Sequence, residues 1–171
     1  MEVKEAIEKR RSIRRYQDKE ISQKIIDELI EAARLAPSAY NAQPWRFRVV
    51  KDKKIIEELK DEKVFKNEFV YTSPLIMVCC GDEKVYPERA KDNFDLKDLV
   101  LVDVSIATQN LVLRATELGI GCCYIGLFDK DKIKEILGID KNLIIPYVIV
   151  LGYADEKPDT KPRKSKEEIL L

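Results

Sequence analysis

Residues 99–126 read LVLVDVSIATQNLVLRATELGIGCCYIG, in which a helical pattern passes directly into a strand pattern. Apolar residues between positions 99 and 118 recur at helical intervals, which predicts a core helix. They fall at Val102, Ile106, Leu113 and Leu118. Gly119 is suited to the left-handed conformation that ends many helices, and residues 121–125 then have the pattern of a strand. A long core helix that leads directly into a strand indicates a mixed α and β fold.

The flanking sequence alternates between helical and strand patterns. Helical spacing predicts a helix between Ser22, its expected N-cap, and Pro37, and further helices over residues 2–10, 54–60 and 129–137. Alternating or continuous apolar runs predict strands over residues 45–49, 74–80 and 144–151. Pro146 is expected to interrupt the last of these strands. Residues 82–98 show no clear period and are expected to form a surface loop or a mobile flap near a site.

Composition limits the classes of function. A length of 171 residues fits one domain, expected to span residues 1–171. Lys plus Arg and Asp plus Glu both number 31, which argues against a nucleic-acid binder. The N-terminus MEVKEAIEKRRS lacks the apolar core of a signal peptide, and no apolar run approaches the roughly 18 residues of a membrane helix. The expected location is therefore the cytoplasm, without a membrane partner.

The chain has four cysteines and no histidine. The pairs Cys79-Cys80 and Cys122-Cys123 stand in apolar stretches, which favours reduced, buried thiols over a disulfide framework. A four-thiolate zinc site is the alternative, although adjacent residues on a strand point to opposite faces. The absence of histidine excludes Ser-His and Cys-His nucleophile pairs. A cofactor that brings its own reactive atoms is therefore the more attractive source of chemistry.

A basic string follows the first predicted helix. It contains Arg10, Arg11, Ser12 and Arg14. Guanidinium groups bind phosphate oxygens bidentately, and a serine hydroxyl can add another hydrogen bond. The alternative is a solvated basic face that complements the helix dipole.

The glycines at positions 119, 121 and 126 do not form a dinucleotide-binding fingerprint. That motif runs from strand to glycines to helix, whereas these glycines follow a helix and precede a strand. A helix cap and a tight turn are the expected roles of Gly119 and Gly121.

Four segments together match one family. They are RRSIRRY (10–16), APSAYNAQPWRF (36–47), DVSIATQNLVLRATELGIGCCYIG (103–126) and KPRKSKEEI (161–169). In this order, across nearly the whole chain, they resemble the nitroreductase family of FMN-dependent oxidoreductases. Four segments in the right order are far more specific than any one of them.

The resemblance implies an α+β fold with a central, mainly antiparallel sheet flanked by helices. It also implies an intertwined homodimer with two FMN sites at the subunit interface. Residues 155–171 are too polar to pack on themselves, and in such proteins the C-terminal arm crosses onto the partner subunit as a two-fold exchange. The lid that longer relatives place over the flavin would be short or absent, which leaves substrate choice to residues 82–98.

The family motifs also imply which residues bind FMN. The phosphate, ribityl chain and pyrimidine edge would be held by Arg10, Arg11, Ser12 and Arg14, with Arg163 and, as a weaker candidate, Lys161 at the phosphate. The loop residues Pro37, Ser38, Ala39 and Asn41 would line the flavin from the other subunit. Packing beside the ring, with a backbone N–H directed to N5, is implied for Tyr124, Ile125 and Gly126. No side chain is expected to be catalytic, and Arg14 is the candidate for stabilising negative charge on the reduced flavin.

The function implied is transfer of hydride from NAD(P)H through flavin N5 to a small oxidised acceptor, such as a nitro compound or a quinone, by a ping-pong mechanism. One alternative is a reductive reaction on another substrate, such as dehalogenation, because fold and cofactor do not fix the reaction. A third leaves catalysis altogether: a module that binds or stores FMN, or an anion-binding interaction domain.

Overall fold

A four-stranded antiparallel sheet forms the centre of the computed structural model, which describes residues 1–171. The strands are β1 (Trp45–Val50), β2 (Leu75–Gly81), β3 (Ile120–Ile125) and β4 (Ile144–Tyr153). Their order across the sheet is β1-β2-β4-β3, and every neighbouring pair is antiparallel. The predicted α+β fold with a mainly antiparallel sheet is confirmed.

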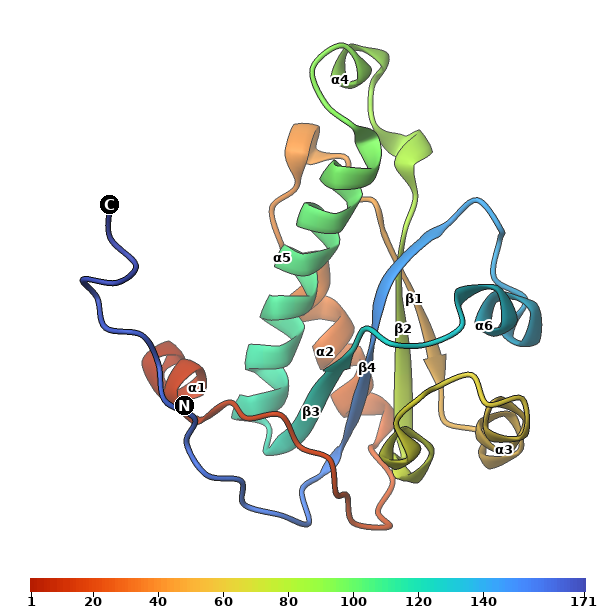
Figure 1. The fold of residues 1–171 in the computed structure, drawn as a ribbon, viewed down its shortest axis with the longest axis vertical. Helices are drawn as coiled ribbons and strands as arrows, with labels where there is room; N and C mark the ends of the chain where they lie inside the picture. The colour runs from red at the N-terminus through yellow and green to blue at the C-terminus, as the bar shows by residue number, and fades with distance from the viewer.

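Helices cover both faces of the sheet, which makes three layers (Figure 1). One face carries α2 (Gln23–Arg34) and α5 (Leu96–Glu117), and the other carries α3 (Lys53–Asp61) and α6 (Lys130–Leu137). The short helix α1 (Val3–Lys9) packs against α5. The remaining helical turns are η1 (Ala39–Asn41), η2 (Glu68–Thr72), η3 (Glu83–Val85) and α4 (Glu88–Lys91).

The position of β2 inside the sheet explains why its sequence is apolar without a break. All seven of its residues are buried. Met77 and Cys79 point into the core under α2 and α5, while Val78 and Cys80 point into the core under α3 and α6. Because neighbouring side chains on a strand face opposite sides, a sheet covered on both faces requires an apolar residue at each position.

Most predicted boundaries agree with the structure because short-range capping sets them. The Ser22 hydroxyl accepts a hydrogen bond from Ile25 N at the start of α2, and Asp129 caps α6 in the same way. Gly119 and Gly138 follow helices with φ of 74° and 63°, the left-handed region that glycine adopts without a steric penalty.

The expected loop or flap over residues 82–98 is wrong in part. This segment holds η3 and α4, and α5 begins at Leu96, where the Asp95 carboxylate accepts from Lys97 N. Helix α5 therefore begins three residues before the expected start at residue 99. The earlier start was missed because the charged residues around Asp95 obscure the helical spacing of the apolar ones.

Two further expectations are also corrected. Pro146 does not interrupt β4, which is continuous over ten residues; a bulge in the pairing with β2 between Cys79 and Gly81 accommodates it. Gly121 is not in a turn but inside β3, opposite Gly152. A Cβ on Gly121 would stand 2.7 Å from Cγ1 of Ile13, so glycine is required there by close packing.

Helix α5 is apolar around most of its circumference. Val100, Val104 and Leu111 face the core, yet Val102 on the outer side is 54% exposed, and Leu101 and Ile106 are exposed too. By length and mean hydropathy alone, α5 is also the one helix that could cross a membrane, although much of it is buried against the sheet and α2. Apolar residues on the outer face of a core helix indicate that this face packs against a further partner.

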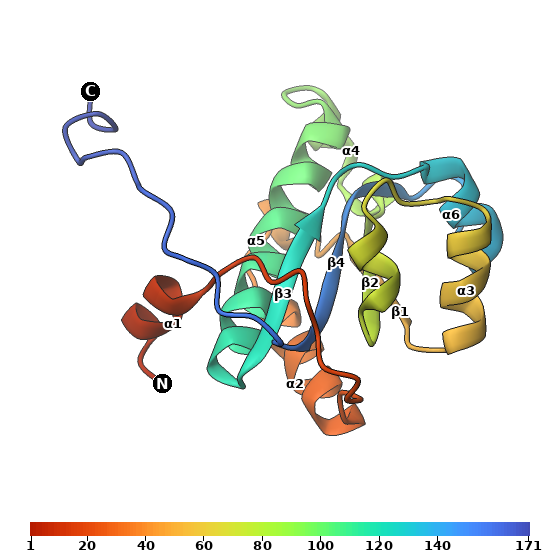
Figure 2. The same cartoon turned by 60° about the horizontal axis from the view of Figure 1, so that its bottom comes forward.

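The C-terminal arm first follows its own chain and then leaves it. Residues 153–160 run beside residues 11–17, through bonds such as Gln17 N to the Tyr153 carbonyl and Asp155 N to the Arg15 carbonyl, both near 3 Å. Residues 161–171 are exposed and extend away from the body (Figure 2). The side chains of Ile169, Leu170 and Leu171 are left in solvent.

Candidate functional site

The outer edge of β3 carries the first part of the site. Ile13 N donates to the Cys122 carbonyl at 2.9 Å, and Ser12 pairs with Cys122 as a parallel bridge. This contact depends on Gly121, whose missing side chain makes room for Ile13. The predicted basic string is thereby fixed along an otherwise open sheet edge.

Arg10 and Arg14 lie near the buried thiols of the same strand. Burial raises the pKa of the Cys123 thiol, while the adjacent Arg14, Ser12 and Arg10 lower it. The Arg14 guanidinium also lies 6.0 Å from the centre of the Phe69 ring. Two of the predicted cations, Arg10 and Arg14, therefore lie beside β3.

The cations are short of counter-charges. Arg10, Arg14, Lys161 and Arg163 form no salt bridge in this chain. The Arg11 guanidinium donates hydrogen bonds to the carbonyls of Glu8 and Arg10, at 2.6 and 2.8 Å, and to the Thr160 hydroxyl at 2.9 Å. That last bond fixes the residue just before the KPRK segment against the N-terminal basic string, while Lys161 and Arg163 themselves lie on the exposed arm.

Glu156 is the acidic residue at this junction. Its carboxylate accepts from Arg14 N at 2.5 Å and from Arg15 N at 3.3 Å. The Arg15 guanidinium lies 3.9 Å away on the same carboxylate. Glu156 thus fastens the backbone of the basic string to the C-terminal arm and leaves the Arg14 guanidinium unpaired.

Tyr124, Ile125 and Gly126 end the same strand, two to four positions beyond Cys122. Tyr124 is partly exposed and packs edge-on against Tyr147, with ring centres 5.0 Å apart. Ile125 is buried. A Cβ on Gly126 would meet no atom within 4 Å, so the chain leaves open space beside this end of β3.

The loop Pro37, Ser38, Ala39 and Asn41 lies elsewhere. It sits beside the N-terminal part of α5, where Ala39 N donates to the Asp103 carboxylate, whereas α1 and the basic string lie at the other end of that helix (Figure 1). From Asp103 to Glu117 the helix rises about 21 Å. One copy of the chain therefore does not bring this loop to the predicted cations.

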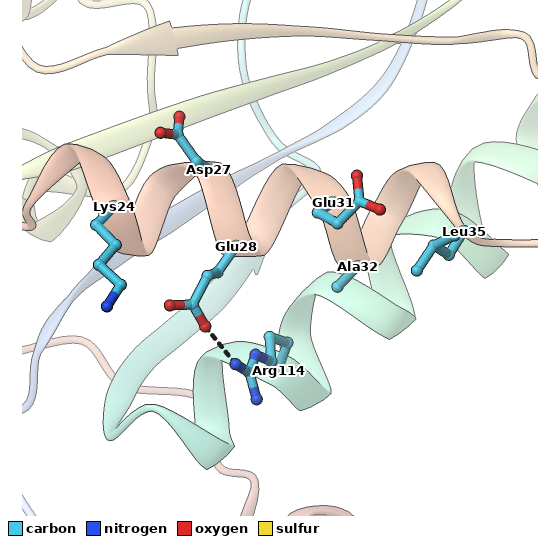
Figure 3. A pocket seen from close by; sticks show the side chains of 7 residues that line it. All are labelled: Lys24, Asp27, Glu28, Glu31, Ala32, Leu35 and Arg114. Atoms are coloured by element: carbon cyan, nitrogen blue, oxygen red, sulfur yellow. Dashed lines mark hydrogen bonds and ion pairs between the residues drawn. The ribbon is translucent and has the colours of Figure 1, made fainter.

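The grooves of the surface differ in charge. A groove of about 410 Å³ runs between α1, the end of α5 and the arm, and includes Arg10, Arg11 and Thr160 in its lining. A larger one of about 660 Å³ between α2 and α5 is lined by Asp27, Glu28 and Glu31 (Figure 3). The Arg114 guanidinium there is already bonded to Glu28 and Glu117. Its carboxylates make the larger groove unsuitable for a phosphate, despite its size.

Sequence reasoning missed three residues around the site. The sequence does not single out Glu156, because glutamate is common in a charged C-terminal segment such as this one. Tyr86 lay in the unassigned segment. Asp103 could have been noticed, since it is a lone carboxylate among the apolar core positions of α5 and is only 2% exposed.

The sequence matches one known protein family over most of its length. A family model described as the nitroreductase family matches residues 7–64 and 60–153. The chain belongs to the nitroreductase family. An Archaeoglobus fulgidus protein provisionally named NADH dehydrogenase/NAD(P)H nitroreductase is 36% identical over 154 residues, 88% of this chain and 84% of the relative.

Two solved nitroreductase-family neighbours carry ligands. A protein provisionally named a nitroreductase, from Exiguobacterium sibiricum in complex with FMN, is 26% identical with a TM-score of 0.85, covering 99% of this chain and 96% of its own. The NADPH:FMN oxidoreductase of Vibrio harveyi complexed with NAD⁺ is 27% identical with a TM-score of 0.84. The match covers 99% of this chain and 76% of the Vibrio harveyi chain. The fold is shared over nearly the whole chain.

Proposed function

We propose that this nitroreductase-family protein is an FMN-dependent NAD(P)H oxidoreductase that acts as a homodimer. Residues 1–171 would form one FMN-binding domain, and the arm of residues 155–171, which first follows its own chain as far as Thr160, would continue onto the partner subunit. Family membership and the FMN and NAD⁺ complexes of the two neighbours support this activity. The acceptor would be a small oxidised molecule such as a nitro compound or a quinone.

The observation that carries the proposal is a pair of arginines without counter-charges beside the point where the basic C-terminal arm leaves the body. Arg10 and Arg14 come from one end of the sequence, and Lys161 and Arg163 follow Thr160, which is bonded to Arg11. A concentration of unpaired cations is costly unless an anion binds. A phosphate monoester carries up to two negative charges and accepts several charge-assisted hydrogen bonds, so the FMN phosphate fits this donor set.

The end of β3 suits a flat ring next to that phosphate site. Gly126 has no side chain and no atom of the chain above it, which would let a ring approach the backbone closely. The partly exposed Tyr124 lies on the same strand end. Arg14, whose guanidinium is not neutralised by any acid, would supply positive charge along the polar edge of the flavin.

A second copy of the chain would complete the site. The loop at Pro37–Asn41 is held about 21 Å along α5 from the basic string, so it can line the flavin only from another subunit. The exposed apolar side chains of Leu101, Val102 and Ile106 on α5 provide a surface for such a partner.

The bound flavin would supply the redox chemistry, accepting hydride from NAD(P)H and passing it to the acceptor in a ping-pong sequence. The protein would bind, orient and provide fixed charges. The chain contains no histidine that could serve as a general acid or base near neutral pH. The residues that matter are therefore those that hold the flavin, rather than a side chain that reacts.

The absorption spectrum tests the proposal. Purified protein reconstituted with FMN should be yellow, and its visible band should bleach when NADH or NADPH is added without oxygen, then recover on addition of a quinone or nitroaromatic. Protein that is colourless after FMN has been added and the unbound FMN removed would refute the flavin site. Yellow protein inert to both nicotinamides would refute the reductase and favour flavin storage or another donor.

A further inference from the structure

Asp103 is a buried carboxylate with an unusual set of partners. It lies in the interior of α5, 2% exposed, among the core residues of that helix. Its two oxygens accept the Ala39 N–H at 3.2 and 3.1 Å, and Oδ2 also accepts the Tyr86 hydroxyl at 2.7 Å. No cation forms a salt bridge with it. A buried carboxyl group whose partners are all neutral donors depends on keeping each of them.

The loop that Asp103 holds is otherwise anchored mainly to itself. Asn41 N donates to the Ser38 carbonyl and Gln43 N to the Ser38 hydroxyl, at 3.0 and 2.9 Å. Outside the loop, the Arg46 guanidinium reaches the Gln43 carbonyl at 3.3 Å. Asp103 is therefore the hydrogen-bond link between this loop and the core helix.

The backbone conformation of the loop requires stabilisation by contacts outside the loop. Tyr40, Asn41 and Gln43 have φ of 56°, 53° and 48°, in the left-handed region that residues other than glycine adopt at a cost. Such a conformation persists only where the surrounding structure fixes it. The Ala39 N–H, directly before these residues, is the point at which Asp103 acts.

Segment 83–91 is tied to the same loop by two contacts. Tyr86, which follows η3, shares the Asp103 carboxylate with Ala39. Arg89 of α4 lies with its guanidinium 5.4 Å from the centre of the Tyr40 ring. The hydroxyl of Tyr86 is buried, and burial, followed by the bond to Asp103, raises its pKa, so it stays a donor across the physiological range.

We propose that Asp103 is a positioning residue: it fixes the loop Ser38–Gln43 in the conformation that lines the flavin, and through Tyr86 it ties segment 83–91 to that loop. The flavin part of this inference rests on the function proposed above. Because Asp103 is only 2% exposed, it would not touch the flavin or the acceptor directly. It acts through the backbone of Ala39, so a change at segment 83–91 would be transmitted to the flavin-lining loop.

Asp103→Asn tests the proposal with little change in volume. The Ala39 amide should exchange with solvent at least about tenfold faster in flavin-free protein, and the Kd for FMN should rise by about tenfold or more, as expected for a lost charge-assisted hydrogen bond. The visible circular dichroism of bound flavin should also change, because the loop lines the ring. The matched control is Asp61→Asn on the exposed end of α3, which removes the same charge and should alter none of these readouts.

Tyr86→Phe separates the two parts of the proposal, and it carries the test if Asp103→Asn does not fold. It should speed amide exchange in segment 83–91 while Ala39 stays protected. Unchanged exchange at Ala39 in Asp103→Asn, or unchanged exchange of segment 83–91 in Tyr86→Phe, would overturn the anchoring. Faster exchange with unaltered FMN affinity would overturn the link to the flavin. Wild-type protein that binds no FMN would refute the proposed function instead, and the exchange measurements would still decide the anchoring.

Discussion

The guanidinium of Arg11 donates a hydrogen bond of 2.9 Å to the hydroxyl of Thr160, 149 residues away in the sequence. This bond joins the N-terminal basic string to the first residues of the C-terminal arm. It is supported by Glu156, which accepts from the backbone of Arg14 and Arg15. Because Arg11 is already engaged, the free cations for a phosphate are the residues on either side of this junction.

Arg10→Ala and Arg163→Ala should each weaken FMN binding by roughly 1.5 to 3 kcal/mol, the range for a lost charge-assisted hydrogen bond. Titration of flavin-free protein followed by fluorescence quenching measures the effect. Arg34→Ala is the control, since Arg34 is an exposed arginine paired with Glu31 on α2. Unchanged affinity in both test variants would mean that the basic string is only a solvated face.

Two glycines on or beside β3 should behave in opposite ways. Gly121→Ala places a methyl group 2.7 Å from Ile13 Cγ1 and should cost about 1 to 3 kcal/mol of stability, as overpacking does. Gly126→Ala meets no atom of the chain within 4 Å. It should leave the stability of flavin-free protein unchanged and weaken FMN binding.

Urea unfolding with and without FMN separates the two effects. If Gly126→Ala retained full FMN affinity, the open space beside this residue would not be the place of the flavin ring. If Gly121→Ala were as stable as the wild type, the side chain of Ile13 would be able to move away from position 121 at no cost in stability.

Local chemistry made much of the fold predictable from the sequence. The Ser22 cap, the glycines after α5 and α6 and the unbroken apolar run of β2 each act over a few residues, so pattern reading found them. The start of α5 and the course of residues 82–98 were missed because their apolar residues are sparse. For the site, the resemblance named residues that the structure places in three separate groups: the loop at 37–41, β3 with the basic string beside it, and the exposed arm that carries Lys161 and Arg163.

Partners far apart in the sequence could not be foreseen. No spacing rule connects Asp103 with Ala39 or Glu156 with Arg14, because both pairs form only once the helices and the arm are in place. A single buried acid in an apolar helix is the one local hint, and it indicates that a partner is needed without naming it.

The cysteines should make stability fall in alkaline solution. Burial raises the pKa of Cys80 to about 11 and of Cys122 to about 12, from an ordinary value of 9.0. Above pH 9 the unfolded thiols lose protons that the folded ones keep, so the unfolded state is favoured as pH rises towards the folded values. Below pH 9 both states keep the protons and no such loss occurs.

Urea unfolding at pH 8, 9 and 10 measures this dependence. The slope above pH 9 should lessen in Cys122→Ala, which removes one such group. Thiol labelling of native protein at pH 8 should also be slow and should become complete on unfolding, since all four thiols are buried and free. Rapid labelling of the native protein would contradict the buried, protonated state.

The outer face of α5 should be the surface between subunits. Val102→Lys places a charge on a residue that is 54% exposed in one chain, so the fold of the single chain should be kept. The variant should sediment as a monomer and lose FMN affinity by about tenfold or more, because the loop from the partner would be missing. Leu35→Lys, an equal change on the 65% exposed residue after α2, should leave both properties intact. A dimeric Val102→Lys would contradict this assignment of the interface.

The C-terminal arm lacks a packing partner within its own chain beyond Thr160. Residues 161–171 make no contact with the body that would explain their sequence, yet they carry Arg163 and end in exposed Ile169, Leu170 and Leu171. Leaving large apolar side chains in water costs roughly 1.5 to 3 kcal/mol each. Docking on the partner subunit would remove that cost and bring Arg163 to the phosphate.

Deletion of residues 161–171 should therefore lower FMN affinity and dimer stability together, since ligand and partner stabilise the same folded state. Deletion of 156–171 also removes the bonds of Glu156 and Thr160 to the basic string, and should lower FMN affinity further. Sedimentation and FMN titration on both truncated proteins measure the two effects. A tight dimer with full FMN affinity after the longer deletion would rule out the exchanged arm, and with it the role of Arg163 at the phosphate.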